Sequence, residues 1–258
     1  MKLPKTVFGI DTEEAYQRVL SSQETKPKPK NQKEQKETNL ETLEDFWTIG
    51  NVEYRNGIYT VDLAKELLDN GNTKTQEQWA EYSKQAKQNN SFHTGDFPLY
   101  HAIFTTLFNN RNGKQKNDVE EIRQFIKQKM VEKWIMTLTR IQYNPKKQKD
   151  KVIHNYNLPD QYPIETDSFV GDDGYIKSTN NVKAPLQTLL DTKQNVNEIN
   201  DVYKWLTDVD AYLWRVNSEV KNTDERVARF VAFSVRAYLD CDGDPQDSGS
   251  GLGVRLRA

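Results

Sequence analysis

The hydrophobic residues in the first half of the chain recur at the spacing of helices. Residues 75–88 begin with a Thr-x-x-Gln capping signal at Thr75, which predicts a helix. Residues 96–110 carry large apolar side chains three and four positions apart and predict a central helix, and residues 119–134 predict a third, amphipathic one. Upstream, residues 44–71 predict one or two strands with a hairpin turn at Asn56–Gly57, followed by a helix that ends at Gly71.

The pattern changes after residue 134. Alternating, β-branched and aromatic stretches predict short strands, with an Asp172-Asp173-Gly174 turn inside one of them, at residues 135–143, 151–157, 169–176, 211–218 and 229–239. Residues 186–191 and 196–210 predict helices. The predicted fold class is therefore α+β, with helices in the first half and short strands with long irregular connections in the second.

The N-terminal segment differs in composition from the rest. Residues 1–20 contain a short apolar piece and a possible helical turn at 13–20, and we interpret them as an N-terminal arm. Residues 21–40 are rich in Lys, Gln, Glu and Pro and have almost no large apolar side chains, which predicts a flexible linker. The main domain is expected to span residues 41–258.

Composition and charge exclude several classes of protein. The 258 residues carry a formal net charge of −2, whereas a general nucleic-acid binder needs a basic excess. No run approaches the roughly 20 apolar residues of a membrane helix, and no signal peptide is recognisable. With one cysteine, no intrachain disulfide forms, so nothing points to an oxidising compartment. Because no signal peptide is recognisable, we expect a cytoplasmic location, while surface display or export by another route stays open.

The histidines and the cysteine are the candidates for metal or nucleophilic chemistry. His93 and His101, with Asp96 between them, lack the spacing of a zinc site, and His154 is interpreted as a hydrogen-bonded strand residue. Cys241 would be a nucleophile only beside a base, and we interpret it as a small buried hydrophobe. Phosphate-loop, serine-hydrolase and zincin motifs are absent from the sequence, so we predict no catalytic residue, metal or cofactor.

The C-terminal stretch DCDGDPQDSGSG looks at first like a calcium loop. Counted from Asp240, acidic residues occupy positions 1, 3 and 5, as in an EF-hand. Position 6 is Pro245, which cannot adopt the turn that Gly makes there, and position 12 is Gly251, which has no ligand atom. The motif therefore fails at its most diagnostic positions.

The same tail shows an unusual composition and alternation. No Asn follows Asn222 and no Lys follows Lys221, although both are abundant earlier. One interleaved set of positions resembles a structural frame, and it includes Ala232, Ser234, Arg236, Ala237, Leu239, Cys241, Pro245, Ser248, Ser250, Leu252, Gly253, Val254 and Arg255. The other set is heterogeneous and consists of Val231, Phe233, Val235, Tyr238, Asp240, Asp242, Gly243, Asp244, Asp247, Gly249 and Gly251. Alternate residues of an extended backbone face opposite sides, so one side is expected to hold the fold and the other to display side chains.

The tail AFSVRAYLDCDGDPQDSGSGLGVRLRA, together with YLWRVN at 212–217, resembles the variable region of diversity-generating retroelement proteins of the archaeal type. In that family a C-type lectin-like domain, related to formylglycine-generating enzymes, ends in an Arg-Ala…Pro…Leu-Gly-Val/Phe-Arg pattern. An error-prone reverse transcriptase replaces template adenines, chiefly in Asn codons. Every residue type of the heterogeneous set is reachable from an Asn codon in this way, which accounts for the missing Asn.

The resemblance implies a C-type lectin-like domain over 41–258, with a variable region at about 229–258, that binds an unknown protein or other macromolecular ligand without catalysis. The heterogeneous set would form the ligand site, with Phe233 and Tyr238 as anchors, a negative charge from the four aspartates and gaps at the glycines. Leu252, Val254 and Leu256 should be buried, and Arg236 and Arg255 should bond backbone carbonyls. Two alternatives stay open. One is a formylglycine-generating-type enzyme, although that chemistry uses two cysteines and this chain has one, and the other is a calcium-stabilised structural module.

Overall fold

The computed structural model describes residues 6–7, 10–11, 38–146, 148–176 and 182–257. The chain divides into two compact units, Met1–Lys36 and Glu37–Ala258. In the first unit, strands β1 (Thr6–Val7) and β2 (Ile10–Asp11) pair antiparallel. The helical turn expected at 13–20 and most of the expected linker lie outside the described residues. Thr38 and Leu40 are buried in the second unit, which therefore begins a few residues before the expected boundary at 41.

The second unit is built around a sheet of twelve strands in the described residues. Nine of them are ordered β10-β11-β13-β12-β7-β14-β5-β4-β3, while β6 pairs with β14 and β8 pairs with β7 and β9. The first six by number are β3 (Leu40–Thr42), β4 (Phe46–Tyr54), β5 (Gly57–Leu67), β6 (His93–Thr94), β7 (Ile135–Tyr143) and β8 (Asp150–His154). The others are β9 (Tyr162–Thr166), β10 (Gly174–Tyr175), β11 (Ala211–Trp214), β12 (Asp224–Ala232), β13 (Ala237–Gly243) and β14 (Ser250–Arg257).

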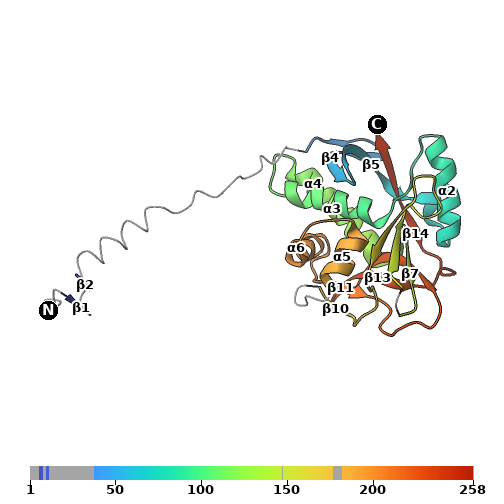
Figure 1. Ribbon diagram of the computed structural model, residues 1–258. Helices are drawn as coiled ribbons and strands as arrows, with labels where there is room; N and C mark the ends of the chain where they lie inside the picture. The colour runs from blue at the N-terminus through green and yellow to red at the C-terminus, as the bar shows by residue number, and fades with distance from the viewer. Residues whose placement is uncertain (1–5, 8–9, 12–37, 147, 177–181, 258) are drawn as a thin grey trace. The chain divides into compact units, whose positions relative to one another are not determined.

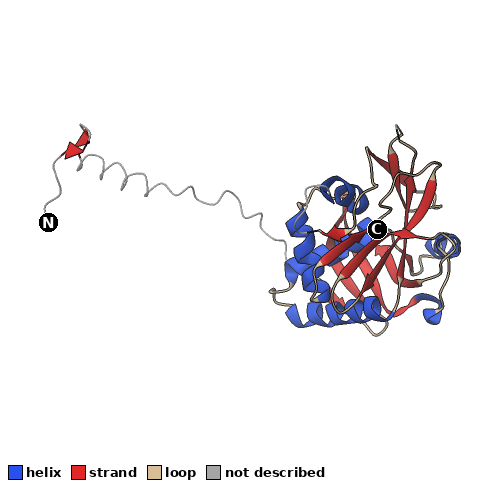
Figure 2. Cartoon of the chain, turned by 90° about the horizontal axis from the view of Figure 1, so that it is seen from below, coloured by secondary structure: helices blue, strands red, loops and turns tan. Residues whose placement is uncertain are grey.

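Helices cover both sides of the strands unequally. One side of the strands carries α3 (Phe97–Asn110), α4 (Lys116–Glu132), α5 (Lys183–Leu190) and α6 (Val196–Thr207), and the other carries α2 (Gln76–Gln88) (Figures 1 and 2). The described chain contains both helices and strands, consistent with the predicted α+β class. The expected separation is wrong, because the long strands β4 and β5 lie in the first half and helices α5 and α6 lie in the second.

Two hydrophobic cores result from this arrangement. The larger one surrounds α3, whose aromatic side chains pack on the inner face of β12, with the rings of Phe97 and Phe230 3.8 Å apart. The smaller one lies under α2, where Trp79 packs with Met136 of β7 and Val227 of β12. Strand β12 therefore contributes alternate residues to two cores on opposite faces of the sheet.

Most predicted elements are confirmed, one is wrong, and the strand expected at 229–239 is interrupted by the turn between β12 and β13. Thr75 caps α2 with the full capping box, and the expected hairpin turn joins β4 to β5. The helix expected to end at Gly71 is instead the second half of β5, which continues to Leu67 before a short 3-10 turn at Leu68–Gly71. Helix-forming residues adopt a strand here because β5 pairs with β4 on one side and β14 on the other, and tertiary pairing outweighs local propensity. Residues 169 and 170, also expected in a strand, lie outside the assigned strands.

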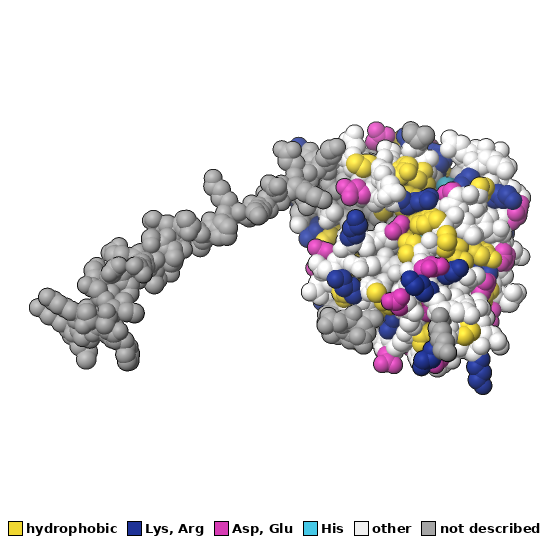
Figure 3. All heavy atoms as spheres, in the orientation of Figure 1, with side chains coloured by type: hydrophobic (Ala, Val, Ile, Leu, Met, Phe, Trp, Pro, Cys, Tyr) yellow, Lys and Arg dark blue, Asp and Glu magenta, His cyan; other side chains and the backbone are white. Residues whose placement is uncertain are grey.

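The C-terminal strand β14 is held in place by a buried carboxylate. Asp62 of β5 is fully buried and accepts hydrogen bonds from Arg255 at 2.7 Å, Arg257 at 2.9 Å and Thr48 at 2.7 Å. Burial opposes ionisation of Asp62, but these hydrogen bonds outweigh it and lower the pKa of the carboxyl below its ordinary value. On the face of the described residues that Figure 3 shows, acidic and basic side chains are interspersed.

Candidate functional site

The β12–β13 hairpin carries the first half of the predicted variable set. Its turn is closed by the amide of Phe233, which donates to the carbonyl of Arg236 at 2.9 Å. Val231 lies opposite Tyr238, and Ala232 lies opposite Ala237. Directly opposed residues of paired strands share a face, so the heterogeneous positions of β12 and β13 lie together on one face of the hairpin.

Strand β13 alternates as the sequence predicts. Leu239 and Cys241 are fully buried in the large core. Tyr238, Asp240 and Asp242 point to the opposite face, where Tyr238 and Asp242 are partly exposed. The predicted alternation of faces is therefore found in this strand, but Asp240, which was expected to be displayed, is buried.

Tyr238 is the centre of a connected set of aromatic rings that we call the aromatic surface. Its ring centroid lies 5.5 Å from Phe233 and 5.4 Å from both Tyr212 and Trp214. Trp134 lies 6.4 Å from Phe233, and Tyr175 lies 5.2 Å from Tyr212. The aromatic surface thus consists of Trp134, Tyr175, Tyr212, Trp214, Phe233 and Tyr238.

Four of these six residues were missed by sequence reasoning. Tyr212 and Trp214 flank the buried Leu213 in a strand, so period-two alternation alone places both on the face opposite the core. Tyr175 reaches the surface because β10 pairs with β11, and Trp134 does so because β7 pairs with β12. Those two depend on strand pairing over long sequence separations, for which the local sequence carries no signal.

Arg236 has a different role from the expected one. Its guanidinium carbon lies 4.5 Å from the ring centroid of Tyr212 and 5.6 and 5.7 Å from those of Tyr238 and Tyr175. It therefore makes cation–π contacts with the aromatic surface where backbone carbonyls were expected as its partners. Arg255 bonds mainly to Asp62, with only a long contact of 3.5 Å to the Asn90 carbonyl.

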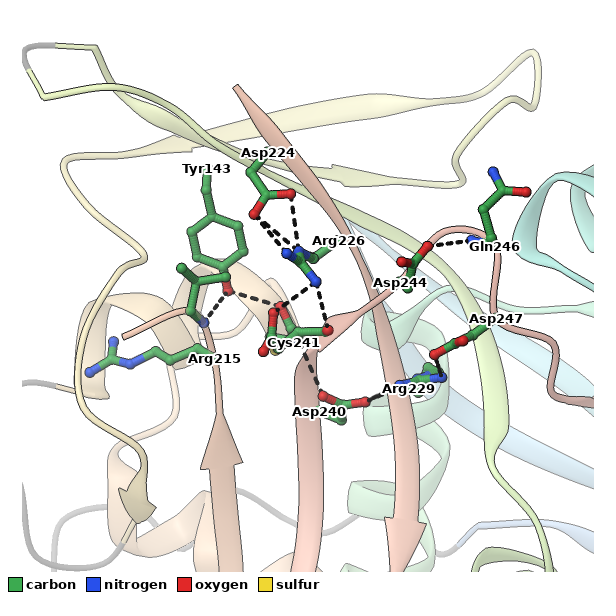
Figure 4. A network of polar contacts seen from close by, with 12 residues as sticks. Tyr143, Arg215, Asp224, Arg226, Arg229, Asp240, Cys241, Asp244, Gln246 and Asp247 are labelled. Carbon is green, nitrogen blue, oxygen red and sulfur yellow. Dashed lines mark hydrogen bonds and ion pairs between the residues drawn. The ribbon is translucent and has the colours of Figure 1, made fainter. Parts of the chain in front are cut away.

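The predicted aspartates are paired with arginines in two groups (Figure 4). Arg229 binds Asp240 at 2.9 Å and Asp247 at 3.0 Å, and its guanidinium lies 4.5 Å from the ring of Trp134. In the second group, Arg226 binds Asp242 at 3.3 Å and also Asp224. Three of the four predicted aspartates are thus partly neutralised, and the patch is less negative than the sequence suggested.

Burial of Asp240 opposes ionisation of its carboxyl. Removal from water raises the pKa of its carboxyl, the Arg229 charge opposes that effect, and the net pKa lies above the ordinary value. The pKa of Asp242 is also raised, again by burial against the opposing charge of Arg226. Asp244 is exposed and accepts from the amide of Gln246 at 2.8 Å.

Several predicted display positions are instead buried. Val231 is only 2% exposed. The expected gaps at the glycines are filled. A Cβ at Gly243 would lie 2.7 Å from Arg229 Nε, at Gly249 2.8 Å from the Trp134 carbonyl, and at Gly251 2.9 Å from Trp79. The strand that begins at residue 250 is paired with neighbours and covered on both faces, so alternation there does not lead to display.

The residues expected to bury or to remain structural behave largely as predicted. Leu252 and Val254 are buried, whereas Leu256 is only partly so. His154 lies 3.1 Å from both Thr139 Oγ1 and the Thr188 carbonyl, as expected for a bonded strand residue. Burial raises the pKa of the Cys241 thiol well above its usual value, which opposes formation of a nucleophilic thiolate.

The other two histidines are also buried, and burial lowers the pKa of both His93 and His101 to about 4. His101 lies 2.8 Å from the side chain of Gln194. Asp96 caps α3 and accepts from Tyr54 at 2.8 Å, and burial raises its pKa to about 6. Within the described residues, no group of three or more His, Cys, Asp or Glu side chains is placed to hold a metal ion.

Comparisons with family models, curated proteins and solved structures gave no match to this chain. No helix in the described part of the chain has the length and apolarity needed to cross a membrane.

Proposed function

We propose that this protein binds a macromolecular ligand through side chains diversified by a retroelement and displayed on a C-type lectin-like domain. The observation that carries the proposal is the one-sided alternation of β13. The heterogeneous residues Tyr238, Asp240 and Asp242 share one face, on which Tyr238 and Asp242 are partly exposed, and the frame residues Leu239 and Cys241 are buried in the core on the other face. A mutational mechanism that spares the frame and alters only alternate codons would produce this arrangement.

The rigidity of the hairpin also supports the proposal. Phe230 of β12, close to the turn that joins β12 to β13, packs on Phe97 and Tyr100 of α3 in the large core. At the turn itself, Phe233 is 47% exposed and Val235 is 61% exposed. Variable contact residues on a rigid scaffold are the arrangement by which antibody loops bind, because little ordering entropy is lost on binding.

The structure narrows the set of residues that we propose to contact ligand. Phe233, Val235, Tyr238, Asp242, Asp244 and Asp247 are exposed or partly exposed. Val231, Asp240, Gly243, Gly249 and Gly251 are buried, and we propose that they limit which substitutions the scaffold accepts. The variable region would then have a displayed part, mainly before residue 248, and a buried part after it.

The genomic neighbourhood tests the proposal directly. A near-copy of the bases encoding residues 229–258, differing only at adenines and lying beside a reverse-transcriptase gene, is expected. Absence of both from the neighbourhood would contradict the proposal.

A matched pair of libraries tests the display positions in the protein itself. One library randomises 233, 235 and 238, and the other randomises 231, 243 and 251. We expect most members of the first to fold and few members of the second, measured by protease resistance of displayed clones. Equal tolerance in both libraries would contradict the assignment of displayed and buried positions.

A further inference from the structure

The exposed hydrophobic side chains of the described residues are not scattered. The large ones are Leu43, Ile58, Val131, Trp134, Tyr175, Trp214, Phe233 and Val235. Four of these eight belong to the aromatic surface, and Val235 lies in the same turn as Phe233. Single exposed apolar residues are normal, but a contiguous group rimmed by polar residues marks an interaction site.

The aromatic surface extends beyond the proposed variable region. Only Phe233 and Tyr238 belong to the heterogeneous set, while Trp134, Tyr175, Tyr212 and Trp214 are contributed by other parts of the chain. A ligand that covers Phe233 and Tyr238 therefore also meets aromatic side chains that diversification would leave unchanged.

Exposed carboxylates lie near the aromatic surface, and the exposed Lys133 next to Trp134 is a cation beside it. The nearby arginines are already engaged, since Arg226 and Arg229 bind aspartates and Arg236 lies over three tyrosine rings. Asp244 and Asp247 are exposed, and one oxygen of Asp247 binds Arg229, whose guanidinium lies over the ring of Trp134. Asp172 is exposed in the turn that leads into β10 and Tyr175. A partner that covers this surface gains electrostatic complementarity if its rim carries Lys or Arg.

The ring geometry favours a protein over a carbohydrate as the partner. Two pairs of neighbouring rings meet steeply, at 86° for Tyr175 and Tyr212 and 85° for Phe233 and Tyr238, while Tyr212 and Trp214 meet Tyr238 at 60° and 46°. No pair of these rings is parallel, so the surface is corrugated. Arg236 covers one face of the Tyr212 ring, the kind of face on which a sugar ring would stack. Trp, Tyr and Arg together are the residues that dominate the binding energy of protein–protein interfaces.

We infer that the aromatic surface binds a protein partner that presents an apolar segment flanked by Lys or Arg side chains. This inference rests on the proposed function and deepens it. Trp134, Tyr175, Tyr212 and Trp214 provide an unchanging half of the contact that contributes affinity for any such partner. Phe233, Val235 and Tyr238 provide the half that selects among partners.

A random peptide display library, selected against the full chain, is the probe that tests the inference. Enriched peptides are expected to combine aromatic or aliphatic residues with Lys or Arg. Trp214→Ala and Phe233→Ala should each weaken binding of an enriched peptide at least tenfold, as at other interface hot spots. Ile58→Ala removes an apolar side chain that is 59% exposed on β5 and serves as the matched control, with affinity unchanged.

A second variant tests the inference even if Trp214→Ala does not fold. Asp244→Lys changes only an exposed turn residue and should weaken binding of the same basic peptides several-fold, with the difference shrinking at high salt. Melting curves of all variants verify that the fold is intact.

The possible results separate this inference from the proposed function. If peptide binding is weakened by Phe233→Ala but not by Trp214→Ala, the inferred contribution of the unchanging aromatic residues is wrong. The proposed binding through diversified residues would not be contradicted by that result. Acidic peptides, failure to enrich any peptide, or binding of neutral oligosaccharides alone would overturn the partner chemistry. A dimer of the chain that dissociates on Trp214→Ala would overturn it in favour of a second copy. The genomic test decides the proposed function independently of all these results.

Discussion

Strands β13 and β14 come from the same C-terminal tail and differ in what their alternation produces. In β13, Leu239 and Cys241 are buried in the large core, whereas Tyr238 and Asp242 on the opposite face are partly exposed and Asp240 is buried beside Arg229. In β14, residues 250–254 are all buried, because the strand lies between β5 and β7 and also pairs with β6. A period-two pattern therefore leads to display only where one face of the sheet is left open.

The buried aspartates associated with the two strands, Asp62 and Asp240, differ in the direction of their pKa shift. Asp62 accepts hydrogen bonds from two arginines of β14 and from Thr48 of β4, and the pKa of its carboxyl is lowered. Asp240 of β13 has one arginine partner, and burial leaves the pKa of its carboxyl raised. Ionisation at neutral pH thus stabilises the fold at Asp62 and costs stability at Asp240.

Asp62→Asn should have the largest effect on stability. It leaves two arginines of β14 without their buried anion, and we expect a loss of about 3 kcal/mol in the free energy of unfolding at pH 7. Because the folded pKa of Asp62 is lowered, its contribution is present at neutral pH and disappears as the pH falls below about 4. Urea titrations of both proteins at several pH values measure this. An equal stability difference at pH 3 and pH 7 would contradict the assigned role.

Gly251→Ser should have the next largest effect. The new Cβ would lie 2.9 Å from both Thr94 Oγ1 and the Trp79 ring, and such overpacking costs about 2 kcal/mol. Thermal unfolding monitored by circular dichroism measures the loss. If the variant melts at the same temperature as the native protein, residue 251 has room for a side chain. That result would contradict the inference that β14, unlike β13, is covered on both faces.

Asp240→Asn should change stability by less than about 1 kcal/mol at pH 7, because Asn Oδ1 still accepts from Arg229 and the cost of a buried charge is removed. The pH dependence has the opposite sign from that of Asp62. The folded pKa is raised, so the native chain loses stability relative to the variant as the pH rises from about 4 towards 7. Urea titrations of both proteins at several pH values measure this. If the native chain instead becomes more stable than the variant as the pH rises, the effect of Arg229 on the pKa of Asp240 is larger than the effect of burial.

Val235→Ser should have the smallest effect, below about 0.5 kcal/mol, because the side chain is 61% exposed in the turn. Val231→Ser is the matched control, because the Val231 side chain is only 2% exposed and its replacement should lower the free energy of unfolding measurably. Chemical unfolding of the two variants side by side is sufficient. Equal losses at both positions would remove the distinction between displayed and buried members of the heterogeneous set.

Much of the fold was predictable because its signals are local. The cap at Thr75, the amphipathic α4 and the apolar α3 follow from spacing alone. The second half of β5 was not predictable, because its strand form is imposed by pairing with β14 almost two hundred residues later in the chain. At the site, Phe233 and Tyr238 were found from composition, whereas Trp134 and Tyr175 join them only through the pairing of distant strands.

By itself, the sequence determined the α+β class and the two-residue alternation of the tail, because both depend on the order of apolar and polar residues along a few turns or strand positions. The tertiary structure alone decided which alternating positions reach solvent, which aspartates meet arginines, and which aromatic residues surround Tyr238. The physical reason is that exposure belongs to a sheet face. Whether that face is covered depends on which strands and helices pack beside it, and those come from distant parts of the chain.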